Sequence, residues 1–244
     1  MLDRLKIKYI QSLGQKKFRE LEGMFIAEGP KVVEDLIESG TAIIKQLYAV
    51  KEWIKKNKKQ SVNIEVVEIT DAELERISQL ATPNKVLAIV QQFEEDSSPV
   101  IKDKITLVLD GIQDPGNMGT LIRIADWFGI KQIICSKESA DIYNPKVVQA
   151  TMGSIARVNI FYTDLAVWLA DQEDVGIYAA TLEGNSITTM KKISEGIIVI
   201  GNESKGINDA ILKLATINIT IPKKGKAESL NAAVAAGIIL SHLV

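Results

Sequence analysis

The sequence contains very little of several residue types from which functional sites are often built. Its 244 residues include one cysteine, Cys135, and one histidine, His242. A lone cysteine excludes an internal disulfide, and one cysteine with one histidine is too few for a structural zinc site, so we expect no metal. Aromatic residues make up only 5% of the chain, which disfavours nucleic-acid recognition by an array of stacking rings.

Long apolar runs are also missing. None reaches the roughly 18 residues that a membrane span needs. The first segment, MLDRLKIKYIQSLGQKKFRE, is too charged for a signal peptide. Together with the near-absence of cysteine, these features predict a cytoplasmic protein with no membrane partner.

Charge is balanced overall but not along the chain. The 29 basic and 31 acidic residues give a net charge of −2. Residues 1–59 carry 13 basic and 8 acidic side chains, whereas residues 60–104 carry 4 and 9. The basic excess lies in two groups, Arg4, Lys6, Lys8, Lys16, Lys17, Arg19 and Lys51, Lys55, Lys56, Lys58, Lys59. A solvated helix face explains such groups as readily as nucleic-acid contact does.

A change of composition divides the chain. The stretch QQFEEDSSPVIKDK at 91–104 is acidic and polar, which is typical of a linker. We therefore predict one domain at 1–95, a linker at 96–104 and a second domain at 105–244. Before the linker, four β-branched runs alternate with amphipathic segments, one of which opens on Thr70 with Glu73 three residues later, a capping-box pattern. This alternation predicts a small α/β sandwich.

The second domain repeats the alternation with more apolar strands, ITLVLD, KQIICS, RVNIFYT, VGIYAATL, GIIVIG and TINITI. Runs that are apolar on both faces indicate a buried parallel sheet, so the fold class is α/β in both halves. Helices are expected at 117–128, 145–152, 165–171 and 229–243.

Ligands of open parallel sheets bind beyond the carboxyl ends of the strands, and three loops there are unusual. In DGIQDPGNMGTLIRIADWFG, a turn rich in glycine and proline leads into a helix that starts near Asn117 and carries Arg123 on its second turn. A plain strand-to-helix turn, with Arg123 paired to a carboxylate, is the alternative. The loop GNESKG lacks the Lys-Ser/Thr end of a P-loop, which excludes an NTPase site and leaves Glu203 as a helix-capping carboxylate. In IPKKGKAESLNAAVAAGIILSHL, Ser229 is the expected cap of an alanine-rich helix.

Taken together, NMGTLIR after DPG, IGNESKG, and IPKKGKAESLNAAVAAGI resemble the SpoU (TrmH-type, SPOUT superfamily) family of RNA ribose methyltransferases over roughly residues 107–243. The segments FIAEGPKVVEDLI and TPNKVLAIV resemble the substrate-binding domain of the rRNA-directed branch. Members of that branch often have glycine where Lys85 follows Pro83 and Asn84 in this chain.

The resemblance implies 2′-O-methylation of an RNA ribose, with large-subunit rRNA as the first candidate and S-adenosyl-L-methionine as the cofactor. It also implies a C-terminal trefoil knot and a homodimer formed through the C-terminal domain. By position, cofactor contacts fall on Thr181, Gly201, Ile221 and Leu230. The family's catalytic polar residues match Asn117, Arg123, Glu203 and Asn231, and its further invariant polar residue matches Ser229.

The roles that the resemblance implies can be compared with side-chain chemistry. A guanidinium keeps its proton, so holding the ribose oxygen or a phosphate through its donors suits Arg123 better than acting as a base. Asn117 and Asn231 would orient Arg123 and the ribose, and Glu203 would brace the loops. Ser229 would cap the last helix or contact RNA.

The basic residues Lys16, Lys17 and Arg19 are candidate RNA contacts in the N-terminal domain. Two other functions stay open at this point. One is a tRNA 2′-O-methyltransferase of the same family, which the separate N-terminal domain disfavours. The other is a non-catalytic ribosome- or RNA-binding protein, which would be expected to have lost some of the catalytic polar residues.

Overall fold

Contacts divide the chain into two compact units in the computed structural model, which describes residues 2–59, 63–94 and 98–244. The first unit is Met1–Glu94 together with Asp141–Arg157, and the second is Glu95–Ala140 together with Val158–Val244. Segment 141–157, which we expected in the second domain, thus packs with the first unit. The expected linker begins in residues that lie outside the described part of the chain.

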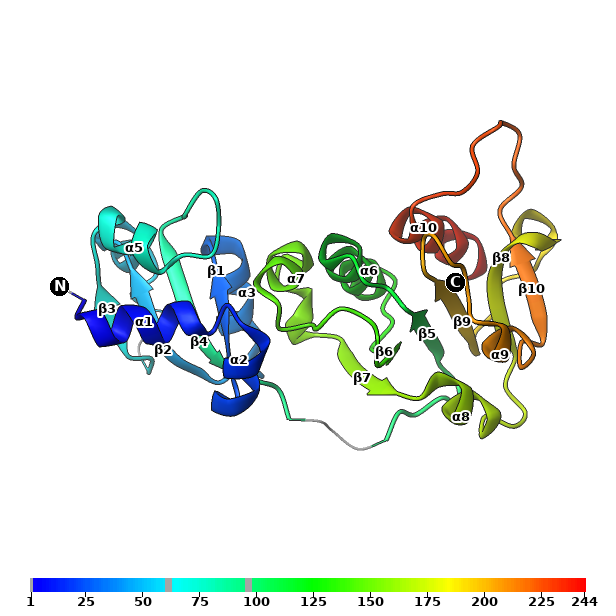
Figure 1. Cartoon of the computed structure of the whole chain (residues 1–244), viewed down its shortest axis with the longest axis horizontal. Helices are drawn as coiled ribbons and strands as arrows, with labels where there is room; N and C mark the ends of the chain where they lie inside the picture. Colours follow the sequence, from blue (N-terminus) through cyan, green and yellow to red (C-terminus); the bar gives the residue numbers. More distant parts are fainter. Residues whose placement is uncertain (1, 60–62, 95–97) are drawn as a thin grey trace. The chain divides into compact units, whose positions relative to one another are not determined.

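The first unit contains a mixed sheet of four strands with helices beside it (Figure 1). The sheet order is β1-β4-β2-β3, with β1 and β2 antiparallel to β4 and β3 parallel to β2. Its strands are β1 (Met24–Glu28), β2 (Ile44–Ala49), β3 (Val66–Glu68) and β4 (Val86–Gln91). Its helices are α1 (Arg4–Ser12), α2 (Lys16–Glu22), α3 (Pro30–Ser39), α4 (Lys51–Lys56), α5 (Asp71–Ile77), α7 (Pro145–Thr151) and the 3₁₀ turn η1 (Ser154–Ala156).

Helix α5 begins at the predicted capping box. The hydroxyl of Thr70 accepts from the backbone N–H of Glu73, and the Glu73 carboxylate accepts from the backbone N–H of Thr70 at 3.0 Å. This carboxylate also accepts from the backbone N–H of Leu2 at 2.7 Å. The N–H groups of Thr70 and Leu2 lower the pKa of Glu73 to about 2, so the cap keeps its charge until strongly acidic pH.

Segment 141–157 supplies part of the first unit's hydrophobic core. Val148 and Ile155 are buried in the same apolar cluster as Phe25 of β1. The ring of Tyr143 lies 4.9 Å from that of Phe25, centroid to centroid. Since burying a side chain of this size stabilises a fold by roughly 1.5–3 kcal/mol, the segment is an integral part of this unit.

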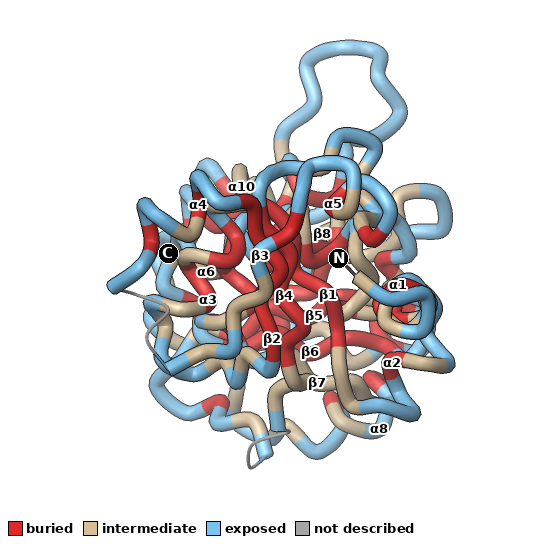
Figure 2. The backbone as a smooth tube through the Cα atoms, turned by 90° about the vertical axis from the view of Figure 1, so that its left-hand side faces the viewer, coloured by how far each residue is buried: buried red, intermediate tan, exposed pale blue. Residues whose placement is uncertain are grey.

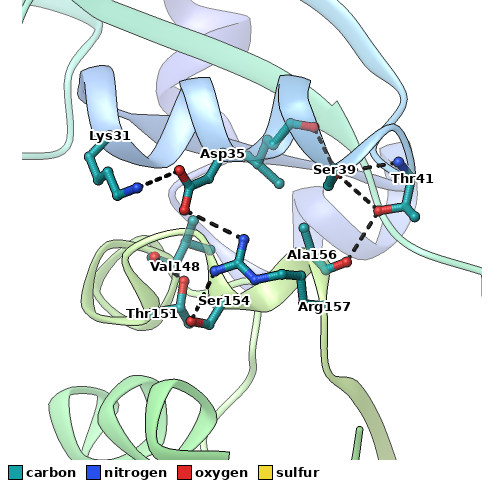
Figure 3. Close-up of polar contacts among 10 residues, drawn as sticks. Lys31, Asp35, Ser39, Thr41, Val148, Thr151, Ser154, Ala156 and Arg157 are labelled. Carbon is teal, nitrogen blue, oxygen red and sulfur yellow. Dashed lines mark hydrogen bonds and ion pairs between the residues drawn. The ribbon is translucent and has the colours of Figure 1, made fainter. Parts of the chain in front are cut away.

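Polar contacts fix the same segment to α3 (Figure 3). The carboxylate of Asp35 pairs with Lys31 at 2.7 Å and with Arg157 at 3.5 Å. At the end of the helix, the hydroxyl of Thr41 donates to the carbonyl of Ala156 at 3.2 Å.

A buried ion pair completes the attachment. Arg19 of α2 is 2% exposed, and its guanidinium lies 2.5 Å from the carboxylate of Asp141. The same guanidinium donates to the carbonyls of Leu13 and Gly14 at 3.0 and 2.9 Å. Arg19 therefore ties the turn after α1 to the start of segment 141–157.

Among the described residues, four that are not glycine adopt a positive φ, namely Lys85, Asp103, Met152 and Asp174. Aspartate tolerates this left-handed region, but the conformation costs a lysine about 1 kcal/mol. Lys85, with φ of 59°, forms an ion pair with Glu52 at 3.3 Å, and both side chains are substantially exposed. Such a surface pair contributes about 0–1 kcal/mol, so it barely offsets the strain.

The second unit is built on a parallel sheet with the order β10-β8-β9-β5-β6-β7 (Figure 1). Its strands are β5 (Ile105–Asp110), β6 (Gln132–Ser136), β7 (Asn159–Thr163), β8 (Ile177–Ser186), β9 (Gly196–Gly201) and β10 (Ile217–Thr220). Its helices are α6 (Pro115–Trp127), α8 (Leu165–Ala170), α9 (Asp209–Leu212), α10 (Ala232–Leu243) and the 3₁₀ turn η2 (Ile187–Thr189).

All pairs in this sheet are parallel, which confirms the predicted parallel α/β architecture. The central strands β5, β6 and β9 are buried over most of their length. Figure 2 shows this burial as red tube at β5 and β6. Burial on both faces is the reason for their uninterrupted apolar sequences. Within the described residues, none of the helices has the length and apolar character needed to cross a bilayer.

Candidate active site

The site lies at the carboxyl edge of the parallel sheet, where the loops after β5, β9 and β10 begin. Because these strands all run in the same direction, their carboxyl ends share one edge. The loop after β5 starts with Gly111 at φ 66° and ends at α6, whose N-cap is Asp114. The Asp114 carboxylate accepts from the backbone N–H of Asn117 at 2.8 Å, which sets the amide side chain of Asn117 in the first turn of α6.

The loop after β9 folds back on itself tightly. A Cβ on Gly201 would lie 2.5 Å from the backbone of Gly206, so only glycine fits there. The backbones of Asn202 and Gly206 exchange two hydrogen bonds, at 3.1 and 2.9 Å. The Asn202 side chain then joins two loops, because its amide donates to the carbonyl of Gly111 at 2.7 Å while its oxygen accepts from the N–H groups of Ser204 and Lys205.

Sequence reasoning missed Asn202. Its position directly after a buried strand, in front of Glu203, was the available signal. Asp110 was not predicted as a site residue either; its carboxylate accepts from the backbone N–H of Asn208 at 2.7 Å. Both residues hold the loops after β5 and β9 together, so they act through backbone geometry.

The loop after β10 differs from the expectation at its end. We expected α10 to begin at Ser229 with that residue as its cap. In the structure α10 begins at Ala232, and Asn231 is the N-cap, accepting from the N–H groups of Ala233 and Val234 at 3.0 and 3.2 Å. Ser229 is exposed and lies outside the helix, within a loop that is exposed from Pro222 onward. The prediction that Ser229 caps this helix is therefore wrong, because Asn231 is the cap.

Three of the four predicted catalytic residues form one hydrogen-bonded chain. The side-chain amide of Asn117 donates to the carboxylate of Glu203, and the amide of Asn231 donates to the side-chain oxygen of Asn117 at 2.8 Å. The three come from different parts of the unit, Asn117 from the first turn of α6, Glu203 from the loop after β9 and Asn231 from the N-cap of α10. The chain therefore fixes the orientation of both amides and leaves the carboxylate of Glu203 half-buried.

Arg123 lies on the same helix as Asn117 but is not part of this chain. Six residues separate the two, which puts their side chains roughly 120° apart around α6. Arg123 is exposed and makes no hydrogen bond or ion pair with any described residue. The amides of Asn117 and Asn231 are bonded to each other rather than to Arg123, so the orienting contacts that we expected are not made here.

Three of the predicted cofactor-binding residues lie on or after neighbouring strands. Thr181 lies within β8, just beyond its pairing with β9, Gly201 ends β9, and Ile221 follows β10; all three are half-buried. The fourth, Leu230, lies in the exposed loop before α10 and is 46% exposed.

The edge of the sheet is irregular at β8. The β8–β10 ladder pairs Ala179 with Asn218 and then Asn185 with Ile219, so residues 180–184 leave the ladder. Thr181 lies in this excursion, where its hydroxyl donates to the carbonyl of Glu183 at 2.6 Å. Parallel strand ends with irregular backbone beside them offer exposed peptide groups to a ligand.

Beside the hydrogen-bonded chain, α6 and α10 form an open groove of about 390 Å³. It is lined by Asn117, Thr120, Ile124, Asn231, Ala233, Val234, Gly237, Ile238 and Ser241. Val234 of α10 presents an apolar side chain at this groove and is 51% exposed. On α6, Trp127 follows Ile124 by three residues, on the same side of the helix, and is 84% exposed.

The predicted RNA-binding residues of the first unit have different environments. Lys16 and Lys17 are exposed, and Lys16 pairs with Glu20 at 3.6 Å. Arg19 is buried, and its guanidinium forms an ion pair with Asp141 and donates to two backbone carbonyls. Arg19 is therefore a structural residue and not an RNA contact, which corrects the sequence interpretation.

The fold and the site define an α/β protein with a hydrogen-bonded chain of two amides and a carboxylate at the carboxyl edge of a parallel sheet, and with an exposed arginine on α6. Comparison with known families gives the particular class. The sequence model of the SpoU rRNA Methylase family matches residues 104–241, and that of the MRM3-like substrate binding domain matches residues 4–88. The chain belongs to the SpoU rRNA Methylase family.

Several characterised proteins are similar over nearly the whole chain. The 23S rRNA (guanosine(2553)-2′-O)-methyltransferase RlmP of Bacillus subtilis is 30% identical over 98% of this chain and 95% of its own. An rRNA methyltransferase from Sinorhizobium meliloti, solved with S-adenosylmethionine bound, has a TM-score of 0.86 at 31% identity over 99% and 95% of the two chains. The SpoU methyltransferase AviRb from Streptomyces viridochromogenes, also solved with this cofactor, has a TM-score of 0.85 at 25% identity over 98% and 97%.

Proposed function

We propose that the protein transfers a methyl group from S-adenosylmethionine to the 2′-hydroxyl of a ribose in large-subunit rRNA. The observation that carries the proposal is the hydrogen-bonded chain of Glu203, Asn117 and Asn231. Its central residue, Asn117, lies on α6, the helix that also presents Arg123. The names of similar proteins support the substrate, because RlmP acts on 23S rRNA.

The strand ends suit the proposed cofactor. Thr181 follows the part of β8 that pairs with β9, Gly201 ends β9 and Ile221 follows β10, so backbone groups rather than charged side chains would contact the cofactor there. The missing side chain of Gly201 is required by the fold of its own loop, because the backbone of Gly206 and Ile207 lies directly against it. Bound at this edge, the cofactor would supply an electrophilic methyl group on a sulfonium.

The protein's own residues would do two things for this reaction. Methyl transfer in line requires donor and acceptor to be aligned, and it is faster when charge developing on the ribose oxygen is stabilised. The donors of Arg123 would hold that oxygen or an adjacent phosphate, which favours the alkoxide-like form of the hydroxyl. Asn117 and Asn231, fixed by Glu203, would hold the ribose in place.

Two alternatives are less well supported. A tRNA-directed enzyme of the same family would not need the N-terminal unit that matches a substrate-binding domain. A non-catalytic RNA-binding protein would not need to keep a complete hydrogen-bonded chain together with an exposed Arg123.

The cofactor can be tested directly. We expect isothermal titration calorimetry to show binding of S-adenosylmethionine by the purified protein without added metal. Transfer of a labelled methyl group to an unmodified 23S rRNA transcript should follow, and ribose-methylation mapping in a strain that lacks the gene should show one lost 2′-O-methyl group in large-subunit rRNA. An absence of cofactor binding both with and without RNA would contradict the proposed reaction.

We further propose that the protein is cytoplasmic and that the chain after β9 forms the trefoil knot implied by the family. We also propose that two chains form a dimer through α6 and α10. The exposed apolar groove between these helices supports the dimer. Trp127 and Val234 are exposed beside Ile124, and exposed aromatic residues are common anchors of interfaces.

Trp127→Glu and Val234→Glu should each convert the dimer to a monomer, because either places a charge in an apolar interface. Sedimentation equilibrium measures the change, and we expect the dissociation constant to rise at least about tenfold. Val167→Glu is the matched control, since Val167 is 63% exposed and lies on α8, which packs against β6 and α9, whereas α6 and α10 pack against each other. A monomeric wild-type protein, or dimers unaffected by both substitutions, would contradict this interface.

A further inference from the structure

Lys85 holds a strained backbone conformation that the contact of its side chain barely offsets. Its φ of 59° lies in the left-handed region that glycine adopts freely. The side chain pairs with Glu52 at 3.3 Å, but Lys85 and Glu52 are 46% and 78% exposed, so water and salt weaken that pair. Backbone strain that the side chain's own ion pair does not offset is a reason to look for a function of that residue.

The backbone on either side of Lys85 is held firmly. Its carbonyl accepts from the backbone N–H of Val50, at the start of α4, at 2.9 Å. On either side, the carbonyl of Asn84 accepts from the N–H of Val86 at 2.7 Å, and the carbonyl of Val86 accepts from the N–H of Gly29 at 2.9 Å. These hydrogen bonds hold the chain in its observed conformation on both sides of Lys85.

The segment that contacts Lys85, residues 50–59, is rich in lysine. Residues 50–59 follow β2 as α4 and its exit, and they contain one acid, Glu52, which Lys85 itself faces. Lys55 and Lys56 lie three and four residues after Glu52, so they share its side of the helix. The exposed lysines of this segment are Lys51, Lys55, Lys56, Lys58 and Lys59.

We propose that Lys85 and the exposed lysines of α4, together the α4 basic surface, bind phosphate groups of the RNA substrate, with Lys85 as a contact that glycine at the same position could not make. This inference rests on the proposed function, because it takes the ligand to be RNA. On binding, phosphate oxygens replace the Glu52 carboxylate as the partner of Lys85. Lysine suits this role as a flexible point charge, and each phosphate that it neutralises releases counterions and adds to the salt dependence of binding.

The substitution Lys85→Gly separates the functional from the structural role. It removes the charge and also relieves the backbone strain, so thermal stability should stay the same or rise by a few degrees. RNA affinity, measured by filter binding to an unmodified 23S rRNA transcript, should fall about threefold to tenfold. The slope of log affinity against log salt should become shallower by about 0.7–1.

Three further variants complete the test. Lys85→Gln keeps a side chain at the strained position but removes the charge, and should weaken binding like Lys85→Gly; Lys85→Arg should bind like the wild type. Lys45→Gln is the matched control, because Lys45 is an exposed lysine near the opposite end of β2 from α4. Unchanged affinity and slope in Lys85→Gly and Lys85→Gln, or an equal loss in Lys45→Gln, would overturn the inference.

The wild-type protein distinguishes this inference from the proposed function. If it binds and methylates the transcript while the Lys85 variants are unaffected, only the α4 basic surface is contradicted. If it takes up S-adenosylmethionine but neither binds nor methylates the transcript, the proposed rRNA substrate is contradicted as well.

Discussion

Arg123→Ala should lower the rate of methyl transfer by about 10²–10³-fold, the usual cost of removing a donor that stabilises developing negative charge. Arg123 is exposed and has no partner among the described residues, so the substitution should change the free energy of unfolding by less than about 0.5 kcal/mol. Affinity for S-adenosylmethionine should be nearly unchanged, because the predicted cofactor contacts lie on β8, at the end of β9 and in the segments after β10, and none lies on α6. Single-turnover kinetics with saturating RNA measures the rate of the chemical step.

Arg123→Lys is the informative companion. It keeps the positive charge but loses the planar pair of donors, so its rate should lie between those of the wild type and Arg123→Ala. Lys131→Ala serves as the control, since Lys131 is an exposed cation in the same unit, between α6 and β6. Turnover retained by Arg123→Ala would remove this residue from the reaction.

Asp141→Ala should destabilise the first unit by about 3 kcal/mol, because it leaves the buried guanidinium of Arg19 without its anionic partner. The two carbonyls that also accept from Arg19 remain, which keeps the expected loss at the lower end of the range for broken buried pairs. Urea unfolding followed by tryptophan fluorescence measures the effect, since the buried Trp53 reports on this unit.

Two variants bracket this result. Glu20→Ala breaks the exposed pair with Lys16 and should cost less than about 1 kcal/mol. The double variant Arg19→Met/Asp141→Ala removes both charges and should recover part of the loss. A loss in Asp141→Ala no larger than in Glu20→Ala would mean that the Arg19–Asp141 pair does not stabilise the unit.

Much of the architecture could be predicted because strong local patterns agree with tertiary structure. The apolar runs ITLVLD and GIIVIG are β5 and β9 with the expected bounds, and the capping box at Thr70 starts α5 as expected. These elements depend on side-chain periodicity, burial on both faces and a local hydrogen bond. Each of these signals lies within a few residues of sequence.

Other features depend on long-range contacts that no local pattern encodes. Arg19 is basic and near other basic residues, but its partner Asp141 is 122 residues away, so its burial was invisible in the sequence. Asn231 was noticed among alanines, but its bond to Asn117 needs two loops that meet only in the folded sheet. Asn202 was missed for the same reason, since its partner Gly111 belongs to another loop.

The placement of segment 141–157 also determines the order in which the protein can fold during synthesis. Domains usually fold as the chain emerges, with the N-terminal one first. Here the first 94 residues must wait until residue 157 has been made, because Val148 and Ile155 fill their core. By then β5, α6 and β6 of the second unit have already been synthesised, so we expect the folding of the two units to overlap in time. A fragment that stops at residue 94 would lack the side chains of Val148 and Ile155 in its core.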